Sequence, residues 1–113
     1  MKAMTAALGV LLLTACATPQ EARDAGPVQT FTSAKSAKAV ADCIASKIEA
    51  KGYASHMGFR PTENGYSINV TQQWNTLYVL EVQDAGTGSQ TLYYKGTVLN
   101  GEAARVEMVA ACQ

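Results

Sequence analysis

Side chains that could carry out acid–base or metal chemistry are few in this 113-residue chain. His56 is the only histidine, and as a lone loop residue it fits a solvated side chain better than a general base. Glu81 and Asp84 lie close together, and paired carboxylates can hydrolyse glycosides, but we interpret them as two solvated acids at the end of a strand. The chain has no cluster with the spacing of metal ligands. We therefore predict no enzymatic activity, no cofactor and no metal site.

The N-terminal residues have the pattern of a secretory signal peptide. Lys2 precedes an uncharged stretch over residues 3–15 that has an apolar middle and small residues at its end. This stretch is shorter than the roughly 20 apolar residues that span a bilayer. It closes with Leu13-Thr14-Ala15-Cys16, and this tetrapeptide resembles the lipobox of bacterial lipoproteins.

The resemblance implies a defined fate for the N-terminus. In bacterial lipoproteins the cysteine thiol receives a diacylglycerol, the signal peptide is cut off before it, and the new amino group is acylated. By this resemblance, residues 1–15 are a lipoprotein signal peptide, and Cys16 carries the lipid, with palmitate, that attaches the mature chain to the membrane. Ala17 and Thr18 lack the aspartate that retains enteric lipoproteins at the inner membrane, so we expect the outer membrane, on its periplasmic side. An ordinary signal peptide in which Cys16 falls by chance is the alternative.

Lipidation of Cys16 would leave Cys43 and Cys112 as an even pair. In the oxidising bacterial envelope such a pair is expected to form a disulfide. The chain-entropy model values a bridge over so long a loop at roughly 4 kcal/mol, which is a large share of the stability of a small domain. Two free buried thiols are the alternative.

The charge balance argues against several classes of partner. Nine basic and nine acidic residues give a formal net charge of zero, so no basic surface indicates nucleic acid. No second apolar run approaches the length of a membrane span. We expect the chain to meet the membrane through its lipid and to present the rest to a periplasmic protein partner.

The residues that follow the signal peptide have the composition of a linker. Residues 16–31 include two prolines, a glycine and few large apolar side chains. We predict a lipidated cysteine and a flexible tether over residues 16–31, followed by one small domain over residues 32–113.

The domain is predicted to open with a helix. Thr32 and Ser33 offer a hydroxyl N-cap, and a glycine after Lys51 ends the pattern. Apolar residues recur between them at helical steps, and these are Ala37, Val40, Ala41, Ile44 and Ile48. The prediction is a helix over residues 34–51, with Cys43 at the border of its buried face.

Three later segments have the composition or alternation of β-strands. They cover residues 66–74, 77–82 and 90–99, and short turns join them. Residues 53–65 are predicted to be irregular because glycine, proline and an Asn-Gly pair interrupt any period. Consecutive strands with short connections predict an antiparallel meander.

Residues 102–113 fit two structures. Every second residue from Val106 to Cys112 is apolar, as in a fourth strand after the turn signal Asn100-Gly101. Four alanines in this segment favour a helix, which Asn100 could cap, and we prefer the helix. The predicted fold is α+β in the order α-β-β-β-α, with the helices on one sheet face and one disulfide.

Aromatic side chains in the predicted strands are the main feature left for binding. The set is Tyr66, Trp74, Tyr78, Tyr93 and Tyr94. Adjacent Tyr93 and Tyr94 must point to opposite sheet faces, and helices on one face would leave the other open. One tyrosine would then be an exposed interface anchor, and Tyr93, Tyr94, Tyr78 and Trp74 are the candidate binding surface. Ordinary packing of cross-strand aromatic pairs is the alternative.

These features predict a lipid-anchored envelope lipoprotein that acts as a non-enzymatic binding or accessory module facing the periplasm. In outline the mature domain is similar to small envelope lipoproteins with one disulfide. The alternative function is an inhibitor or immunity protein against a periplasmic toxin or lysozyme. Glu63, Glu81 and Asp84 would then face a basic enzyme.

Overall fold

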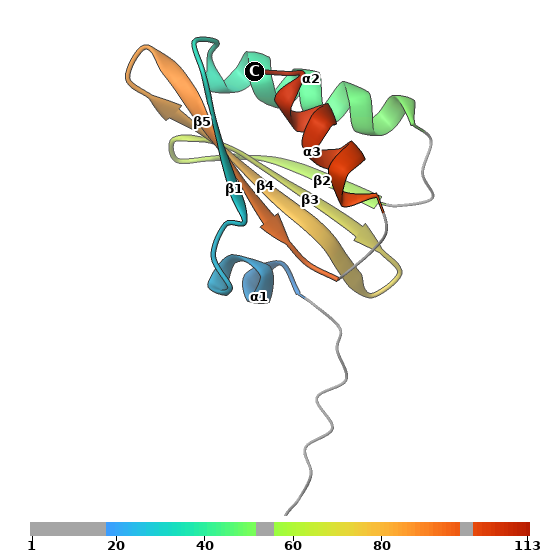
Figure 1. Cartoon of the computed structure of the whole chain (residues 1–113). Coiled ribbons are helices and arrows are strands. Elements are labelled where there is room, and N and C mark those ends of the chain that lie inside the picture. The colour runs from blue at the N-terminus through green and yellow to red at the C-terminus, as the bar shows by residue number, and fades with distance from the viewer. Residues whose placement is uncertain (1–17, 52–55, 98–100) are drawn as a thin grey trace, which may run out of the picture.

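The computed structural model describes residues 18–51, 56–97 and 101–113, so the predicted signal peptide and Cys16 lie outside the described residues. The described residues form three helices and a five-stranded sheet (Figure 1). In chain order the elements are α1 (Pro19–Asp24), β1 (Gln29–Ser33), α2 (Ala37–Ala50), β2 (His56–Thr62), β3 (Gly65–Gln72), β4 (Asn75–Ala85), β5 (Gly88–Lys95) and α3 (Glu102–Ala110). Over these three ranges, no helix combines the length and hydropathy needed to cross a membrane.

All strand pairs are antiparallel, in the order β1-β5-β4-β3-β2. The predicted meander is present as β3, β4 and β5. β2 adds a hairpin at one edge, and β1 pairs with β5 at the other. The α+β class is therefore confirmed, and the predicted number of strands is too low.

Both missed strands lie at the edges of the sheet, where the sequence signals of strands are weakest. β2 contains Gly58 and Pro61, which predicted an irregular segment over residues 53–65. An edge strand accepts proline because one side of its backbone has no partner strand. β1 is only five residues long, and Phe31 is its one buried residue, so no repeating pattern reveals it.

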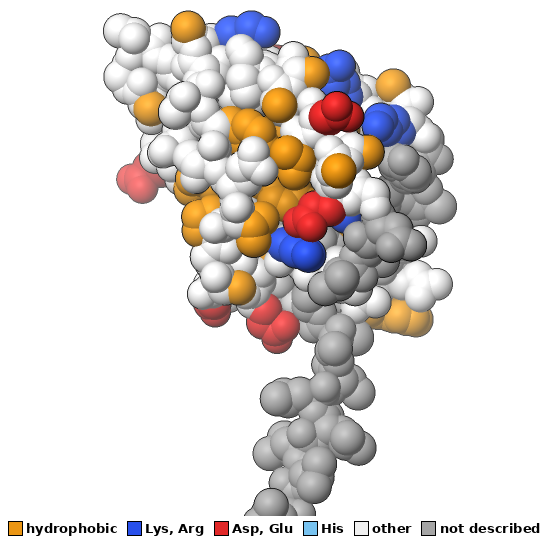
Figure 2. All heavy atoms as spheres, viewed as in Figure 1, with side chains coloured by type: hydrophobic (Ala, Val, Ile, Leu, Met, Phe, Trp, Pro, Cys, Tyr) orange, Lys and Arg blue, Asp and Glu red, His pale blue; other side chains and the backbone are white. Residues whose placement is uncertain are grey.

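The main core lies between one face of the sheet and the helices α2 and α3. Alternate residues of β4, including Leu80 and Val82, are fully buried on this face. Val40, Ala41 and Ile44 of α2 form the buried stripe opposite. Figure 1 shows α2 and α3 on the same side of the sheet. In the space-filling view, hydrophobic side chains gather between β1 and α3 with charged side chains around them (Figure 2).

Helix α2 agrees with the predicted segment 34–51 except at its start. Its N-cap is Ser36, whose side-chain oxygen accepts a hydrogen bond from the Ala39 amide over 3.2 Å. Thr32 and Ser33, the predicted caps, belong to β1 instead. Pairing with β5 keeps the backbone extended through Ser33, so the next hydroxyl residue caps the helix.

The C-terminal segment forms the preferred helix, α3, rather than a fourth strand of the meander. Its N-cap is Gly101, in the left-handed conformation with φ of 90° and no side-chain cap. Asn100, the predicted cap, lies outside the described residues. Met108 and Val109 are the buried residues of the helix, and they close the core beside α2.

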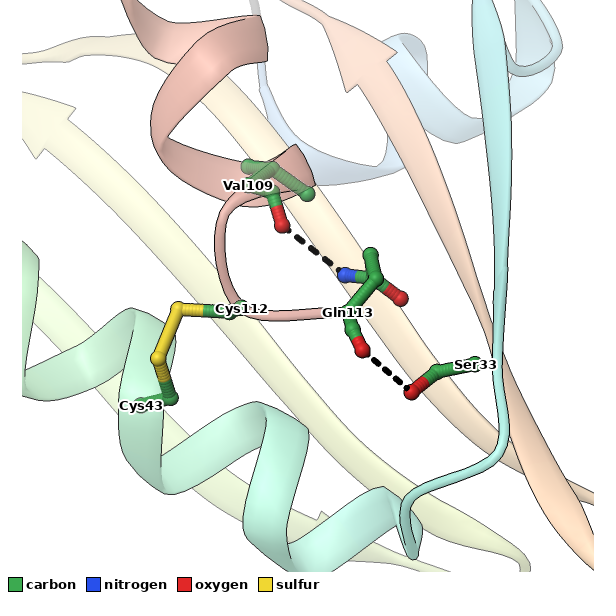
Figure 3. Close-up of a disulfide and its surroundings, with 5 residues drawn as sticks. All are labelled: Ser33, Cys43, Val109, Cys112 and Gln113. Atoms are coloured by element: carbon green, nitrogen blue, oxygen red, sulfur yellow. Dashed lines mark hydrogen bonds between the residues drawn. A yellow bond between two sulfur atoms is a disulfide. The ribbon is translucent and has the colours of Figure 1, made fainter.

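The predicted disulfide between Cys43 and Cys112 is confirmed, with Cα atoms 5.7 Å apart. It joins α2 to the residues that follow α3 (Figure 3). Gln113 adds two hydrogen bonds: its backbone oxygen accepts from the Ser33 hydroxyl over 3.1 Å, and its Nε2 donates to the Val109 carbonyl over 2.9 Å. The C-terminal residues are therefore attached to α2, β1 and α3.

Residues 18–31, predicted as part of a tether, contain ordered elements. Thr18 and Glu21 form a capping box, in which Thr18 Oγ1 accepts from the Glu21 amide over 3.1 Å. Pro19 lies in the first turn of α1. Backbone N–H groups in the first turn have no partner within the helix, so proline loses no hydrogen bond there. Ala22 is buried. The residues that suggested flexibility are the start of a helix, and the ordered domain begins before residue 32.

Candidate functional site on the polar face of the sheet

The sheet has a second face, opposite α2 and α3, which we call the polar face. Alternation along β3, β4 and β5 places these residues on it: Ser67, Asn69, Thr71, Val79, Glu81, Gln83, Gln90, Leu92 and Tyr94. Helix α1 lies against β4 and β5, and its Arg23 contacts this face. The two predicted helices, α2 and α3, share one sheet face as expected, whereas α1, which was not predicted, lies on the other face.

Arg23 of α1 is bound to three side chains of the polar face. Its Nε donates to Glu81 Oε1 over 2.8 Å, and its Nη2 donates to Ser67 Oγ over 3.0 Å and to Asn69 Oδ1 over 3.2 Å. The Ser67 hydroxyl donates to the same Glu81 oxygen over 2.9 Å. We call these four residues the Arg23 cluster. They balance one positive charge with one negative charge and fasten α1 to β3 and β4.

The Arg23 cluster is largely shielded from water. The side chains of Arg23 and Glu81 are 21% and 14% exposed, and Ser67 is fully buried. Removing one partner of such a pair leaves a poorly solvated charge, which is strongly destabilising. Glu81 Oε1 already accepts two hydrogen bonds. This geometry suits the fixing of a helix to a sheet better than proton transfer.

The residues considered for acid–base chemistry do not come together. Glu81 belongs to the Arg23 cluster, whereas Asp84 lies an odd number of positions further along β4 and faces the opposite way. His56 begins the edge strand β2 and is exposed, so the prediction that it lies in a loop is wrong. Among the described residues, no group of three or more histidine, cysteine or acidic side chains could hold a metal ion.

Two of the four candidate binding residues belong to the core. Tyr93 and Tyr78 are 0% and 5% exposed, and their rings stack with centroids 5.6 Å apart. Arg105 of α3 donates from Nε to the Tyr93 hydroxyl over 3.3 Å and lies over the Tyr78 ring. Ordinary packing therefore accounts for this pair, and neither ring is available to a partner.

Tyr94 lies on the polar face, half-buried beside the Arg23 cluster. Burial raises the pKa of its hydroxyl, and the negative charge of Glu81 raises it further, while the positive charge of Arg23 partly offsets both. The hydroxyl is therefore protonated at neutral pH and can donate a hydrogen bond. Leu92 is half-buried on the same face. These two residues remain as candidates for a binding surface on the sheet.

Trp74 lies on neither face of the sheet. It was predicted at the end of a strand, but it occupies the two-residue turn between β3 and β4. Its side chain is 84% exposed, more than any other large hydrophobic side chain among the described residues. The four predicted residues thus divide into a buried pair, a residue on the polar face and a residue at a hairpin tip.

The sequence analysis did not identify Arg23, Ser67 or Asn69 as site residues. Arg23 was hidden because its segment was interpreted as a tether, although Thr18 and Glu21 have the spacing of a capping box. Ser67 and Asn69 lie at the polar positions of the alternating pattern in residues 66–74. Nothing in the sequence shows that a helix covers them.

No family model, no curated protein and no solved structure matches this chain.

Proposed function

We propose that the chain is a lipid-anchored lipoprotein of the bacterial envelope, held at the outer membrane through Cys16. The observation that carries this proposal is the tetrapeptide Leu13-Thr14-Ala15-Cys16 after an uncharged apolar stretch. The disulfide between Cys43 and Cys112 supports it, because structural disulfides persist in oxidising compartments such as the envelope.

The proposed activity of the domain is non-enzymatic binding of a periplasmic protein. Tyr94 and Leu92 are the proposed contact residues, and Thr30 of β1, exposed and paired with Leu92, extends their surface. The Arg23 cluster holds α1 rigidly beside them, which lowers the entropic cost of binding. Tyrosine suits this role because it offers a large ring and a hydroxyl donor.

Palmitate labelling of cells that express the full chain tests the lipid anchor. The wild-type chain is expected to incorporate the label and to lose residues 1–15. Cys16→Ser should do neither and should accumulate as a precursor. Cys43→Ser is the matched control, because it changes a cysteine outside the lipobox and should leave labelling intact. Label on the Cys16→Ser chain would overturn the proposal.

Site-specific photo-crosslinking in intact cells tests the binding surface. A photoreactive amino acid at Tyr94 is expected to yield a discrete adduct with one envelope protein. The same amino acid at Lys38, an exposed position of α2, is the control and should yield none. Equal adducts at both positions, or none at Tyr94, would contradict binding through the polar face.

One observation favours the second function, an inhibitor or immunity protein. Glu63 and Asp84 are both exposed, and the amide of Asp84 donates to the carbonyl of Asn64 over 2.8 Å. Two acids are thus presented at one end of the sheet, where they could contact a basic enzyme. Glu81, the third predicted acid, is paired with Arg23 and does not take part.

Inhibition assays with lysozyme test this second function. The purified wild-type protein should lower the lytic activity of a basic periplasmic lysozyme, and Glu63→Gln/Asp84→Asn should lower it less. Glu107→Gln changes an exposed acid of α3 and serves as the control. Lysozyme activity that is the same with and without the wild-type protein would exclude this enzyme as the target.

A further inference from the structure

Trp74 is held at the tip of a tight hairpin. Gln73 and Trp74 form the turn between Gln72 and Asn75, which pair across β3 and β4. Gln73 has φ of 54°, a left-handed conformation that two-residue hairpins favour and that non-glycine residues rarely adopt. The turn projects Trp74 into solvent with 84% of its side chain exposed. A large amphipathic indole is therefore presented outside the core.

The hairpin tip lies at the same end of the sheet as α1. In the strand register, Tyr78 near the start of β4 is opposite Lys95 at the end of β5, and β1 begins opposite Tyr93. Helix α1 shortly precedes β1 and lies against β4 and β5. Figure 1 shows α1 and the turn between β3 and β4 at the lower end of the view. We call this the Trp74 end of the sheet.

A lipid on Cys16 would have to lie close to the Trp74 end. Thr18 is fixed as the N-cap of α1, and only Ala17 stands between it and Cys16. Covalent geometry keeps the Cα atom of Cys16 within about 8 Å of that of Thr18. The Arg23 cluster in turn fixes α1 to the sheet. With so short a link, the domain cannot stand far from a bilayer that holds the lipid.

The hairpin tip that carries Trp74 is uncharged. Residues 71–77, which include the tip, contain no charged side chain. At the opposite end lie the exposed acids Glu63 and Asp84. The exposed acids Glu21 and Asp24 of α1 also lie at the Trp74 end, where they accept hydrogen bonds from Thr18 and Gln20. Uncharged amides and an indole suit the headgroup region, where tryptophan is enriched in membrane proteins.

We propose that Trp74 inserts into the interface of the bilayer that holds the lipid of Cys16. The Trp74 end of the domain then contacts the bilayer, and the opposite end, with Glu63 and Asp84, faces the periplasm. This inference rests on the proposed lipidation. The lipid supplies the attachment, and Trp74 fixes the orientation of the domain.

Fluorescence tests the inference directly, because Trp74 is the only tryptophan of the chain. The mature protein, purified from cells that express the full chain, is reconstituted in vesicles of phosphatidylethanolamine and phosphatidylglycerol. Matched vesicles contain lipids brominated near the headgroup. Trp74 emission is expected to shift to shorter wavelength in both vesicles, relative to lipid-free protein released by proteolytic cleavage of the chain after Cys16, and to lose intensity with brominated lipid.

The control moves the single indole to the other end of the sheet. Thr87 is exposed in the turn between β4 and β5, so Trp74→Phe/Thr87→Trp should emit at long wavelength and should not be quenched by brominated lipid. Circular dichroism confirms that the variant is folded.

The outcomes separate the two proposals. Acyl groups on Cys16 by mass spectrometry, with the two indoles equally unquenched, would overturn the role of Trp74 and leave the lipoprotein proposal standing. A mature chain without acyl groups would overturn both. Shielding of Trp74 only after an envelope protein is added would assign the indole to a protein partner and also overturn the membrane role.

Discussion

The Nε atom of Arg23 lies 2.8 Å from Oε1 of Glu81, although 58 positions separate the two residues in the sequence. This contact joins the first helix to the middle of the sheet. Arg23 also binds Ser67 and Asn69 on the neighbouring strand. A helix of six residues is too short to be stable alone in water. The Arg23 cluster and the burial of Ala22 therefore hold α1 in place.

Replacement of Arg23 should release α1 from the sheet. Arg23→Ala leaves Glu81 with little solvent and without its cation, which should lower the free energy of unfolding by about 2 kcal/mol. Limited proteolysis should then cut the chain near α1 faster than in the wild-type protein. Chemical denaturation measures the first effect and mass spectrometry of the fragments the second.

The matched control for Arg23→Ala is Lys38→Ala. Lys38 pairs with Asp42 on the surface of α2, where both side chains are more than half exposed, so its loss should change stability far less than Arg23→Ala does. Equal effects of the two substitutions would show that the Arg23 cluster is not a shielded pair.

Loss of the disulfide should weaken the whole domain. The bridge closes a loop with a sequence separation of 69, for which the chain-entropy model gives about 4 kcal/mol. Cys43→Ser/Cys112→Ser should therefore melt at a markedly lower temperature than the oxidised protein. Reduced wild-type protein is the control and should match the variant. Rapid alkylation of both thiols in the native, unreduced protein would show that no bridge forms in solution.

The helix α2 could be predicted from sequence because its stripe from Ala37 to Ile48 is local and regular. The edge strand β2 could not be predicted in this way. Glycine and proline, here Gly58 and Pro61, occur in edge strands as well as in loops. What distinguishes the two is the pairing of residues 56–62 with β3, which is a contact between distant segments.

The candidate site also depends on contacts between distant segments, which local sequence patterns do not predict. Adjacent Tyr93 and Tyr94 were predicted to face opposite ways, and the structure confirms this by burying Tyr93 in the main core and placing Tyr94 on the polar face. The sequence does not reveal that α1 covers part of that face. Helix α1 covers the face because Arg23 contacts Glu81, and no local sequence pattern identifies this pair.

The two adjacent tyrosines should respond differently to substitution. Tyr93→Ala removes a fully buried ring, which should cost about 4 kcal/mol through cavity formation. Tyr94→Ala should cost about 1 kcal/mol because the ring is only half-buried. If Tyr93→Ala does not fold, Tyr93→Phe tests the same site, since loss of the hydroxyl that accepts from Arg105 should cost about 1 kcal/mol. Similar unfolding midpoints for Tyr93→Ala and Tyr94→Ala would contradict this assignment of faces.

Stability in alkaline solution should depend on Tyr94. Its pKa in the folded protein lies above the ordinary value of 10.0, chiefly because burial disfavours the phenolate and because Glu81 repels it. Below the ordinary value the hydroxyl is protonated in both states and adds no pH dependence. Above it, the unfolded chain loses this proton first, so the free energy of unfolding should fall as the pH rises towards the pKa of the folded state.

Tyr94→Phe isolates this effect because phenylalanine cannot ionise. Denaturation midpoints are measured for both proteins from neutral pH to about pH 11, which is above the ordinary pKa of tyrosine. The wild-type protein should lose more stability than Tyr94→Phe over the upper part of this range, and the two curves should be parallel below it. Parallel curves throughout would mean that Tyr94 is as well solvated in the folded protein as in the unfolded chain, and its half-buried position beside Glu81 would then be wrong.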